Sequence, residues 1–257
     1  MTKETMFSLA GKRTIVTGGA RGIGKVVAEH MAMMGSDIAI IDLLKDEADK
    51  TAAGIAKTYG VMSKAYLCDV TNPKEVNAAI DQIATDFGGL DVLFNNAGIV
   101  LHKAALEVTP REWTDVFDVN THGMFFVAQA FAKKLVALGK GGSIINNASM
   151  SASIVNIPQE QASYNASKSA AVHMTKSLAI EWIKYGIRVN SLSPGYIFTD
   201  LTAHVNPDWL KEWTEMSPCK RLGKPEELAG AVIYLASDCS SYTSGCDLIV
   251  DGLFSVV

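Results

Sequence analysis

Short apolar runs rich in β-branched residues alternate with longer helix-forming segments along this chain. Such alternation predicts βα units whose strands form one parallel sheet covered by helices, with a ligand site at the carboxyl ends of the strands. With 257 residues, 48% of them hydrophobic, the chain can bury one such core, and we expect a single domain spanning 1–257. The expected strands are 14–17, 38–41, 64–67, 92–94, 142–147, 188–193 and 247–250, separated by helices that include 45–59, 73–87, 164–185 and 225–236.

A glycine-rich turn follows the first expected strand. Gly18, Gly22 and Gly24 have the spacing Gly-x3-Gly-x-Gly, with Arg21 and Ile23 between them. Glycine lets the strand turn sharply and lets the backbone approach a pyrophosphate, while the amide groups that open the next helix bind that anion. The turn therefore predicts a dinucleotide site, although an ordinary strand–helix turn could carry the same glycines.

Asp42 closes the second expected strand, roughly 20 residues beyond the glycines. A carboxylate at this point can bind the adenosine ribose hydroxyls and would repel a 2′-phosphate, so it favours NAD over NADP. Two alternatives stay open. Asp42 could cap the helix that begins near Lys45, and Arg21 or Lys45 could bind a 2′-phosphate.

Further small and polar residues stand at the ends of the third and fourth expected strands. Asp69 and Val70, after the third strand, could lie beside an adenine. The small residues after the fourth strand, Asn96, Ala97 and Gly98, would let the chain pass close beneath a cofactor.

Asn120 and Gly123 lie in the later half of a helical segment that starts at Pro110. Both residue types are unfavourable inside a helix, which indicates a bend or a local polar role. The alternative is that Asn120 is tolerated inside the helix and has no special role.

Tyr164 and Lys168 lie four residues apart on the expected helix 164–185, so their side chains share one face. A free phenol loses its proton near pH ~10, and an adjacent ammonium group favours the phenolate. The pair predicts a site of proton transfer, although this spacing also occurs on solvated helix faces.

The composition argues against several other classes of protein. A net charge of −4 and a pI near 5.7 do not favour nucleic acid or an anionic membrane as partner. The four cysteines lack CxxC spacing and the five histidines lack paired spacing, so no metal site is predicted. We see no signal region and no apolar run of the ~18 residues that span a membrane, and expect a cytoplasmic protein.

Together these residues resemble the short-chain dehydrogenase/reductase family over nearly the whole chain. The resemblance implies a Rossmann-type, doubly wound α/β domain with a parallel sheet of about seven strands, NAD(P) at the carboxyl ends, and usually a homotetramer. The matching motifs are Thr17-Gly18-x3-Gly22-Ile23-Gly24, Asn95-Asn96-Ala97-Gly98, Asn120, a serine after the fifth strand, Tyr164-x3-Lys168 and Pro194-Gly195.

The resemblance also implies roles for the matching residues. Tyr164 would take the proton of a substrate hydroxyl as hydride leaves its carbon for the nicotinamide. Lys168 would lower the Tyr164 pKa and hold the nicotinamide ribose. Asn120 would position a water that links Lys168 to solvent. Further implied cofactor contacts are Pro194, Ile197 at the nicotinamide, and Thr199 at a phosphate or the carboxamide.

The catalytic serine has two candidates. Counting back 13 residues from Tyr164 gives Ser151, whereas counting forward from the fifth strand gives Ser149. We favour Ser149 because a strand fixes register and a loop absorbs insertions. Its hydroxyl would stabilise charge that develops on the substrate oxygen.

The loop from Ile154 to Gln159 resembles family members that act on sugar alcohols and ketoses, such as mannitol, arabinitol and sorbose/xylulose oxidoreductases. Polar side chains suit a substrate with several hydroxyls, and a segment around 199–220 suits a lid. The expected substrate contacts are Ser149, Ser151, Asn156, Gln159 and Tyr164.

Two other functions stay open. A gluconate-type sugar-acid dehydrogenase would need a cation near the pocket, for which His102, Lys103 or His204 could serve. A catalytically silent dinucleotide-binding regulator would be expected to lack the tyrosine or the lysine, and both are present.

Overall fold

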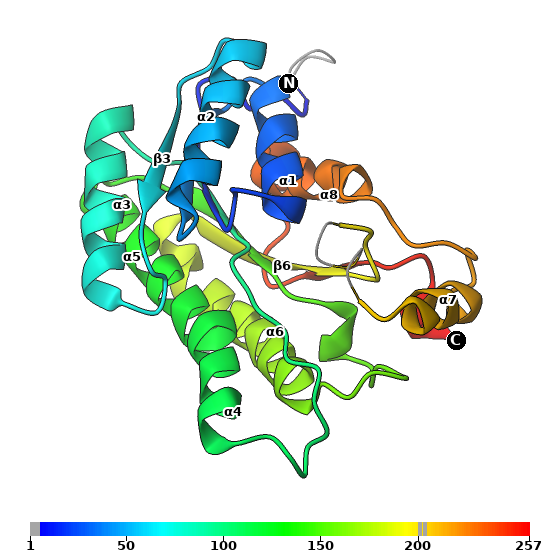
Figure 1. Cartoon of the computed structure of the whole chain (residues 1–257). Coiled ribbons are helices and arrows are strands. Elements are labelled where there is room, and N and C mark those ends of the chain that lie inside the picture. Colours follow the sequence, from blue (N-terminus) through cyan, green and yellow to red (C-terminus); the bar gives the residue numbers. More distant parts are fainter. Residues whose placement is uncertain (1–5, 200–201, 203–204) are drawn as a thin grey trace.

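The computed structural model describes residues 6–199, 202 and 205–257. Within these residues helices and strands alternate as the sequence predicts (Figure 1). The helices are α1 (Gly22–Met33), α2 (Lys45–Tyr59), α3 (Pro73–Phe87), α4 (Pro110–Phe117), α5 (Met124–Ala137), α6 (Ala162–Trp182), α7 (Pro207–Met216) and α8 (Glu226–Ala236). The strands are β1 (Arg13–Thr17), β2 (Asp37–Asp42), β3 (Ser63–Leu67), β4 (Val92–Asn95), β5 (Gly142–Asn147), β6 (Ile187–Pro194) and β7 (Asp247–Val250).

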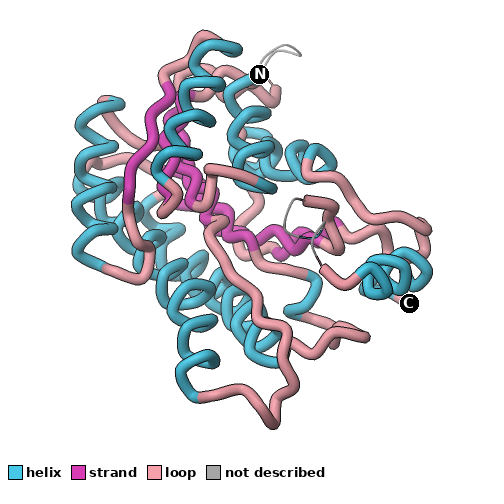
Figure 2. The backbone as a smooth tube through the Cα atoms, viewed as in Figure 1, coloured by secondary structure: helices cyan, strands magenta, loops and turns pink. Residues whose placement is uncertain are grey.

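The seven strands form one sheet in the order β3-β2-β1-β4-β5-β6-β7, and every neighbouring pair is parallel. The chain leaves β1 toward β2 and β3, then returns to the other side of β1 as β4. The order therefore reverses between β1 and β4, which is where a sheet of this kind opens a crevice at its carboxyl edge. The predicted doubly wound fold is confirmed, and Figure 2 shows the strands stacked across the middle of the molecule.

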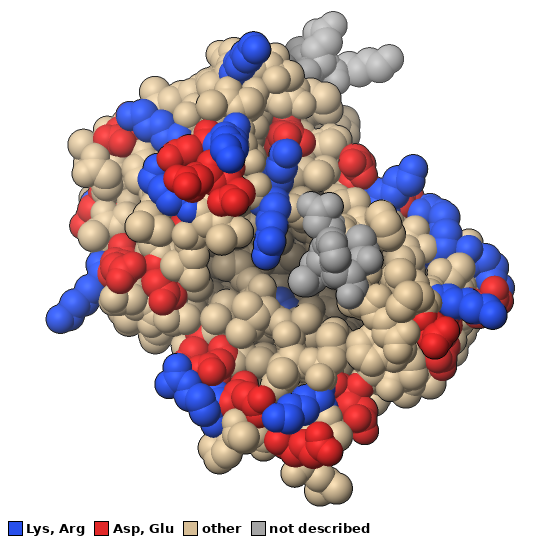
Figure 3. All heavy atoms as spheres, viewed as in Figure 1, with Lys and Arg blue, Asp and Glu red and all other residues tan. Residues whose placement is uncertain are grey.

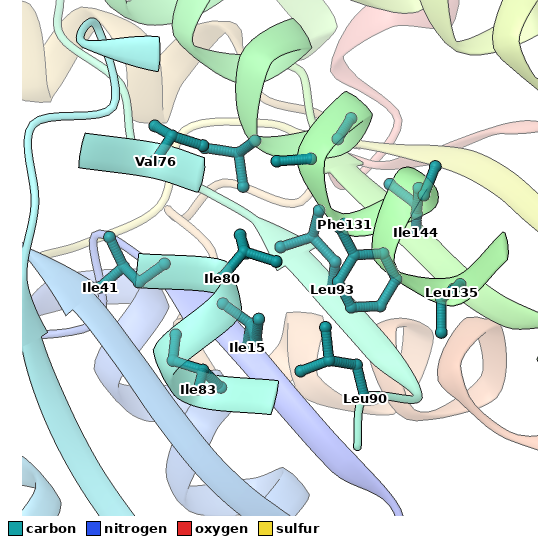
Figure 4. Close-up of a cluster of buried hydrophobic side chains, with 14 of the residues drawn as sticks. Ile15, Ile41, Val76, Ile80, Ile83, Leu90, Leu93, Phe131, Leu135 and Ile144 are labelled. Atoms are coloured by element: carbon teal, nitrogen blue, oxygen red, sulfur yellow. The ribbon is translucent and has the colours of Figure 1, made fainter. Parts of the chain in front are cut away.

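Both faces of the sheet are buried, which explains the continuous apolar runs in the strands. Alternate residues of one strand point to opposite faces. In β1, Ile15 packs into the cluster under α3 and α5, shown in Figure 4, and Val16 packs into the cluster under α1, α2 and α8. The two helical layers hold the sheet rigid, so its carboxyl edge is a fixed platform for side chains.

Local signals set the ends of several helices. Asn72 caps α3 by accepting a bond from the amide of Lys74, and Pro73 occupies the first turn. Gly88 ends the same helix with a φ of +69°, a left-handed conformation that glycine adopts without strain. Helix α6 begins two residues before the predicted start at Tyr164, so the tyrosine lies within the first turn.

The predicted irregularity after Pro110 is confirmed. Helix α4 ends at Phe117, and Asp118–Gly123 forms a π-helical turn before α5 begins. A side chain at Gly123 would lie 2.9 Å from Cγ2 of Val70, so glycine lets the loop after β3 approach this turn. Such turns place an extra residue in the helix and are frequent at functional sites.

The segment predicted as a lid, 199–220, contains the ten-residue helix α7. Residues 200, 201, 203 and 204, including His204, lie outside the described residues. None of the helices described is long and apolar enough to cross a membrane.

Candidate active site

The glycine-rich turn between β1 and α1 is as tight as its composition predicts. Gly18 has a φ of +64°, and a Cβ on it would lie 3.0 Å from the Cα of Ala97. A Cβ on Gly24 would lie 2.1 Å from the carbonyl oxygen of Gly18. Gly24 cannot carry a side chain, because the obstructing atoms belong mostly to the backbone, and at Gly18 the left-handed backbone and the nearby Ala97 both disfavour one. The N-terminus of α1 is thereby brought directly above the end of β1, where its amide groups can bind an anion.

Asparagine side chains tie the carboxyl ends of the central strands together. Asn96 donates its side-chain amide to the carbonyls of Thr17 and Gly18, and the Thr17 hydroxyl accepts from the backbone amides of Asn96 and Ala97. Asn147 donates to the side-chain oxygen of Asn96 at 2.8 Å. These bonds fix the floor of the crevice across β1, β4 and β5.

Asp42 lies beside the glycine-rich turn at the end of β2. Its Oδ2 accepts from the amide of Ala20 and its Oδ1 from the amide of Leu44, both at 2.9 Å. Helix α2 has no side-chain cap, so Asp42 does not cap that helix. A carboxylate has about four acceptor positions, and two therefore stay available for hydroxyls of a ligand.

The remaining predicted cofactor residues lie along the same carboxyl edge. Val70 is buried after β3, and Asp69 beside it accepts two bonds from Thr71. Ile197 is buried after β6 and forms a bridge with Gly223, while the Thr199 amide donates to the hydroxyl of Thr202. The other members of the set are Arg21, Gly22, Ile23, Gly98 and Pro194, all in or next to the loops that follow β1, β4 and β6.

Tyr164 and Lys168 lie on one face of α6, as predicted. The Lys168 Nζ is 5.5 Å from the centroid of the Tyr164 ring and donates a 2.8 Å bond to the carbonyl of Asn147. Lys168 is only 3% exposed. The ammonium group therefore lies inside the protein, between α6 and the end of β5.

Burial dominates the titration of both groups. It lowers the pKa of Lys168 to about 8. It also raises the pKa of the Tyr164 phenol, with the Ser149 hydroxyl acting in the opposite direction and Tyr196 adding to the rise. We expected Lys168 to lower the Tyr164 pKa. In the protein alone burial outweighs that effect, because the ammonium group is bonded to Asn147 rather than to the phenol.

Ser149, not Ser151, is the serine whose hydroxyl is close enough to Tyr164 to lower the pKa of its phenol. The two serine hydroxyls lie 3.0 Å apart, and Ser149 Oγ also accepts the backbone amide of Ser151. Both serines are buried. The strand register therefore puts Ser149 beside the tyrosine, and Ser151 holds Ser149 in place through these hydrogen bonds.

Asn120 is fully buried in the π-helical turn. Its side chain accepts from the amide of Ile99, donates to the carbonyl of Ile99 and donates to the hydroxyl of Ser167. The asparagine thus fastens the loop after β4 to α6 beside Lys168. Both Nδ2 hydrogens are used, while Oδ1 accepts one bond from the residues described and has a second acceptor position. The predicted role of Asn120 in holding a water therefore stays a prediction.

The polar residues of the loop after β5 form a network that sequence reasoning did not foresee. Asn156 Nδ2 and Gln159 Nε2 both donate to the hydroxyl of Tyr196, at 2.9 and 2.8 Å. Gln159 Oε1 accepts the indole N–H of Trp213 at 2.9 Å, and that indole stacks on the Tyr196 ring at 4.2 Å between centroids. The signals available were the Pro-Gly-Tyr sequence after β6 and the tryptophan in the lid, but their pairing depends on long-range folding.

The face of the molecule in Figure 3 is hollowed at its centre, with lysine or arginine side chains beside the hollow. A separate cavity of about 110 Å³ lies next to Tyr196 and Ile197. Neither Tyr164 nor Lys168 lines this cavity. It is therefore not where the reacting groups meet.

A crevice at the switch point that suits a dinucleotide, with buried Ser149 and Lys168 and half-buried Tyr164 at its edge, is typical of a nicotinamide-dependent oxidoreductase of the Rossmann type. The family model described as enoyl-(acyl carrier protein) reductase matches residues 18–254. The chain belongs to the short-chain dehydrogenase/reductase family.

Several curated relatives are similar over nearly the whole chain. A probable NADP-dependent mannitol dehydrogenase of Yarrowia lipolytica is 45% identical over 248 residues, covering 96% of this chain and 88% of the relative. A sorbose reductase of Candida albicans is 43% identical, with coverage of 96% and 88%. An NADH-dependent L-xylulose reductase of Ambrosiozyma monospora is 38% identical, with 97% of each chain covered.

Solved structures share the fold. A short-chain type dehydrogenase/reductase from Mycobacterium marinum superimposes with a TM-score of 0.91 at 43% identity, covering 97% of both chains. A gluconate 5-dehydrogenase from Burkholderia cenocepacia, in complex with NADP and tartrate, gives a TM-score of 0.94 at 34% identity over 100% of both chains.

Proposed function

We propose that this protein interconverts a secondary hydroxyl of a sugar alcohol and the corresponding ketose, using a nicotinamide dinucleotide. The observation that carries the proposal is the grouping of Ser149, Tyr164 and Lys168 at the ends of β5 and α6, next to a buried loop of amide side chains. The relatives named as mannitol dehydrogenase, sorbose reductase and L-xylulose reductase support this substrate class.

The residues of the constellation divide the reaction between them. A bound oxidised nicotinamide ring supplies the acceptor for hydride from the substrate carbon. Tyr164 takes the proton of the reacting hydroxyl, and Ser149 donates a hydrogen bond to the oxygen on which charge changes. Lys168 lies behind the tyrosine, where its charge favours the phenolate and its ammonium group can hold the ribose. Asn120 keeps the surrounding backbone in place.

The described cations give little support to a sugar acid as the main substrate. Lys103 is paired with Glu112 at 2.8 Å. Burial lowers the pKa of His102, so its ring stays neutral near pH 7. A carboxylate therefore has no partner at these two residues, whereas neutral hydroxyls suit the amide and hydroxyl groups of the site. The gluconate 5-dehydrogenase structure keeps a gluconate-type activity as the second candidate.

NAD is the cofactor that we propose, in preference to NADP. The Asp42 carboxylate is held at the end of β2 by two backbone amides, where its charge would oppose a 2′-phosphate. Lys45, one candidate for binding that phosphate, is paired with Asp49. Arg21 is the competing feature, since it is exposed at the start of α1 and forms no ion pair with the residues described. Relatives named for NADP and for NADH both exist.

We also infer a homo-oligomer, and a tetramer is the expected form. Helices α4 and α6 lie together and carry exposed apolar side chains, with Trp113 40% and Ile180 80% exposed. Apolar groups of this size on neighbouring helices are typical of a protein interface. A cytoplasmic location is supported by the four cysteines, all of which are free thiols.

Steady-state kinetics with a panel of substrates tests the proposal. Mannitol, sorbitol, arabinitol, xylitol and gluconate would be compared with cyclohexanol and a hydroxysteroid, each with NAD and with NADP. We expect the highest kcat/KM for a five- or six-carbon polyol with NAD. A preference for either apolar alcohol would contradict the polyol assignment, and turnover of gluconate alone would favour the second candidate.

The variant Tyr164→Phe provides the control for chemistry. It keeps the ring and removes the hydroxyl, so turnover should be lost while fluorescence titration still detects NADH binding. A wild-type protein that binds NADH but turns over none of the substrates would instead be a silent dinucleotide-binding regulator.

A further inference from the structure

The hydroxyl of Tyr196 has both of its acceptor positions filled. Asn156 Nδ2 and Gln159 Nε2 donate to it at 2.9 and 2.8 Å. A tyrosine hydroxyl has one O–H donor and acceptor lone pairs that suit two bonds of this kind. What remains is the O–H itself, which can bond only to an acceptor.

The direction of the Gln159 amide is fixed by chemistry. Trp213 Nε1 is a donor without acceptor capacity, and it lies 2.9 Å from the Gln159 side chain. The atom of Gln159 that faces the indole must therefore be the oxygen. The amide nitrogen then faces Tyr196, so the phenol accepts from Gln159 and cannot donate to it.

Packing holds the phenol in one position. The Tyr196 ring stacks on the Trp213 indole with centroids 4.2 Å apart and planes 7° apart, and its edge meets Phe254 at 5.2 Å. Trp213, Gln159 and Asn156 are nearly fully buried, whereas Tyr196 keeps partial exposure. A rigid donor with an accessible side is well suited to selecting a ligand.

A chain of hydrogen bonds joins this phenol to the reacting groups. Ser149 bonds to Ser151, and Gln161 Nε2 lies 3.4 Å from Ser151 Oγ and 3.1 Å from Asn156 Oδ1. Asn156 then bonds to Tyr196. Tyr196 is also close enough to raise the pKa of Tyr164. The network therefore connects the Tyr196 phenol to the residues beside Tyr164.

Within residues 6–199, 202 and 205–257, no acceptor receives the Tyr196 proton. We propose that the Tyr196 hydroxyl is a specificity-determining donor that binds an oxygen of the substrate beyond the reacting carbon. This inference rests on the proposed function. It adds that the enzyme selects polyols and ketoses over simple alcohols through this hydrogen bond, and that Asn156 and Gln159 act through Tyr196 as positioning residues.

The test compares Tyr196→Phe with the wild type on a polyol and on cyclohexanol, with the same dinucleotide. The variant keeps the stacked ring and loses the donor. We expect kcat/KM for the best polyol to fall roughly tenfold or more, mainly through KM, and kcat/KM for cyclohexanol to change by less than about threefold. The ratio of the two values is the measurement, because it cancels a general loss of active protein.

Two further variants separate a donor from a packing role. Tyr234→Phe removes a hydroxyl that bonds to Thr243 at 2.8 Å on the opposite layer of helices, and should leave the ratio unchanged. Trp213→Phe removes the indole N–H but keeps the Tyr196 hydroxyl, and should weaken the preference less than Tyr196→Phe does.

The outcomes distinguish the two proposals. The wild type could prefer the polyol while Tyr196→Phe lowers kcat/KM equally for both substrates or for neither. In that case the donor role is wrong and the proposed function stands. If the wild type prefers cyclohexanol, both are wrong. A selective loss on the polyol supports both.

Discussion

Replacing Lys168 by methionine should abolish turnover and, near neutral pH, make the folded protein more stable. Lys168 is 3% exposed, and among residues 6–199, 202 and 205–257 its ammonium group has one hydrogen bond, to the carbonyl of Asn147. A buried charge with so little compensation costs free energy. Methionine matches the length of the lysine stem and carries no charge, so it should fill the same space between α6 and β5.

The size of the stability gain follows from the lowered pKa of Lys168. Burial lowers the Lys168 pKa from 10.5 to about 8, and the difference is worth roughly 3 kcal/mol of unfolding free energy below pH 8. Losing the bond to Asn147 costs about 1 kcal/mol in return. We expect a net gain of roughly 2 kcal/mol at pH 7, which for a chain of this size raises Tm by about 4–8 °C.

The lowered pKa of Lys168 also determines how the stability difference between the two proteins changes with pH. Between pH 8 and pH 10.5 the unfolded state binds more protons than the folded state, so the Lys168 contribution makes the wild type more stable as pH rises. The advantage of Lys168→Met should therefore be largest below pH 8 and disappear toward pH 10.5. Burial also raises the pKa of Cys68, to about 12, but that thiol is common to both proteins and cancels in the difference.

Urea unfolding of both proteins without dinucleotide, from pH 6.5 to 10, would measure the difference. Protein concentration must be matched, because an oligomer gains stability by mass action. Lys50→Met on the exposed face of α2, away from the inferred α4–α6 interface, is the matched control and should change stability by less than about 0.5 kcal/mol. Equal or lower stability of Lys168→Met at pH 7, or a difference that does not change with pH, would refute the reasoning.

Four other substitutions test separate parts of the site. Ser149→Ala should lower kcat about 10²–10³-fold and Ser151→Ala much less, because Ser149 is the serine that lowers the pKa of the Tyr164 phenol. A reversed order in steady-state assays would show that the loop places the catalytic hydroxyl. Asp42→Ala should narrow the NAD-to-NADP ratio of kcat/KM by about tenfold, and an unchanged ratio would mean that Asp42 only braces the turn. Gly24→Ala should lower soluble yield or Tm sharply, since its Cβ would lie 2.1 Å from a backbone oxygen, and a stable variant with normal NAD binding would contradict the close packing inferred there.

Much of this architecture could be predicted from local sequence patterns, because each of the features concerned depends on residues that are near one another in the chain. The glycine-rich turn needs only Gly18 and Gly24, and the Tyr164–Lys168 pair needs only the helical repeat. The choice of Ser149 followed from strand register, which is also local. The fold that these patterns predicted is confirmed, whereas the roles of Ser149, Tyr164 and Lys168 stay predictions.

The remaining features depend on contacts between distant segments. Gln159 meets Trp213 across 54 positions of the chain, and Asn156 meets Tyr196 across 40. Spacing cannot reveal such pairs, so the loop amides were assigned directly to the substrate. The depth at which Lys168 is buried depends on β5 and the loop after it, and for this reason the direction of the Tyr164 pKa could not be derived from the four-residue spacing alone.

The reversal of strand order at β1 and β4 has a practical consequence for redesign. Asp42 ends β2 and Tyr196 follows β6, and in the sheet these strands are separated by β1, β4 and β5. At ~4.8 Å per strand, the two residues lie roughly 19 Å apart, well beyond the distance over which substitutions usually influence one another. Coenzyme choice and substrate choice should therefore be separately adjustable, and a library built at one end of the crevice could be combined with a library at the other without screening every pair.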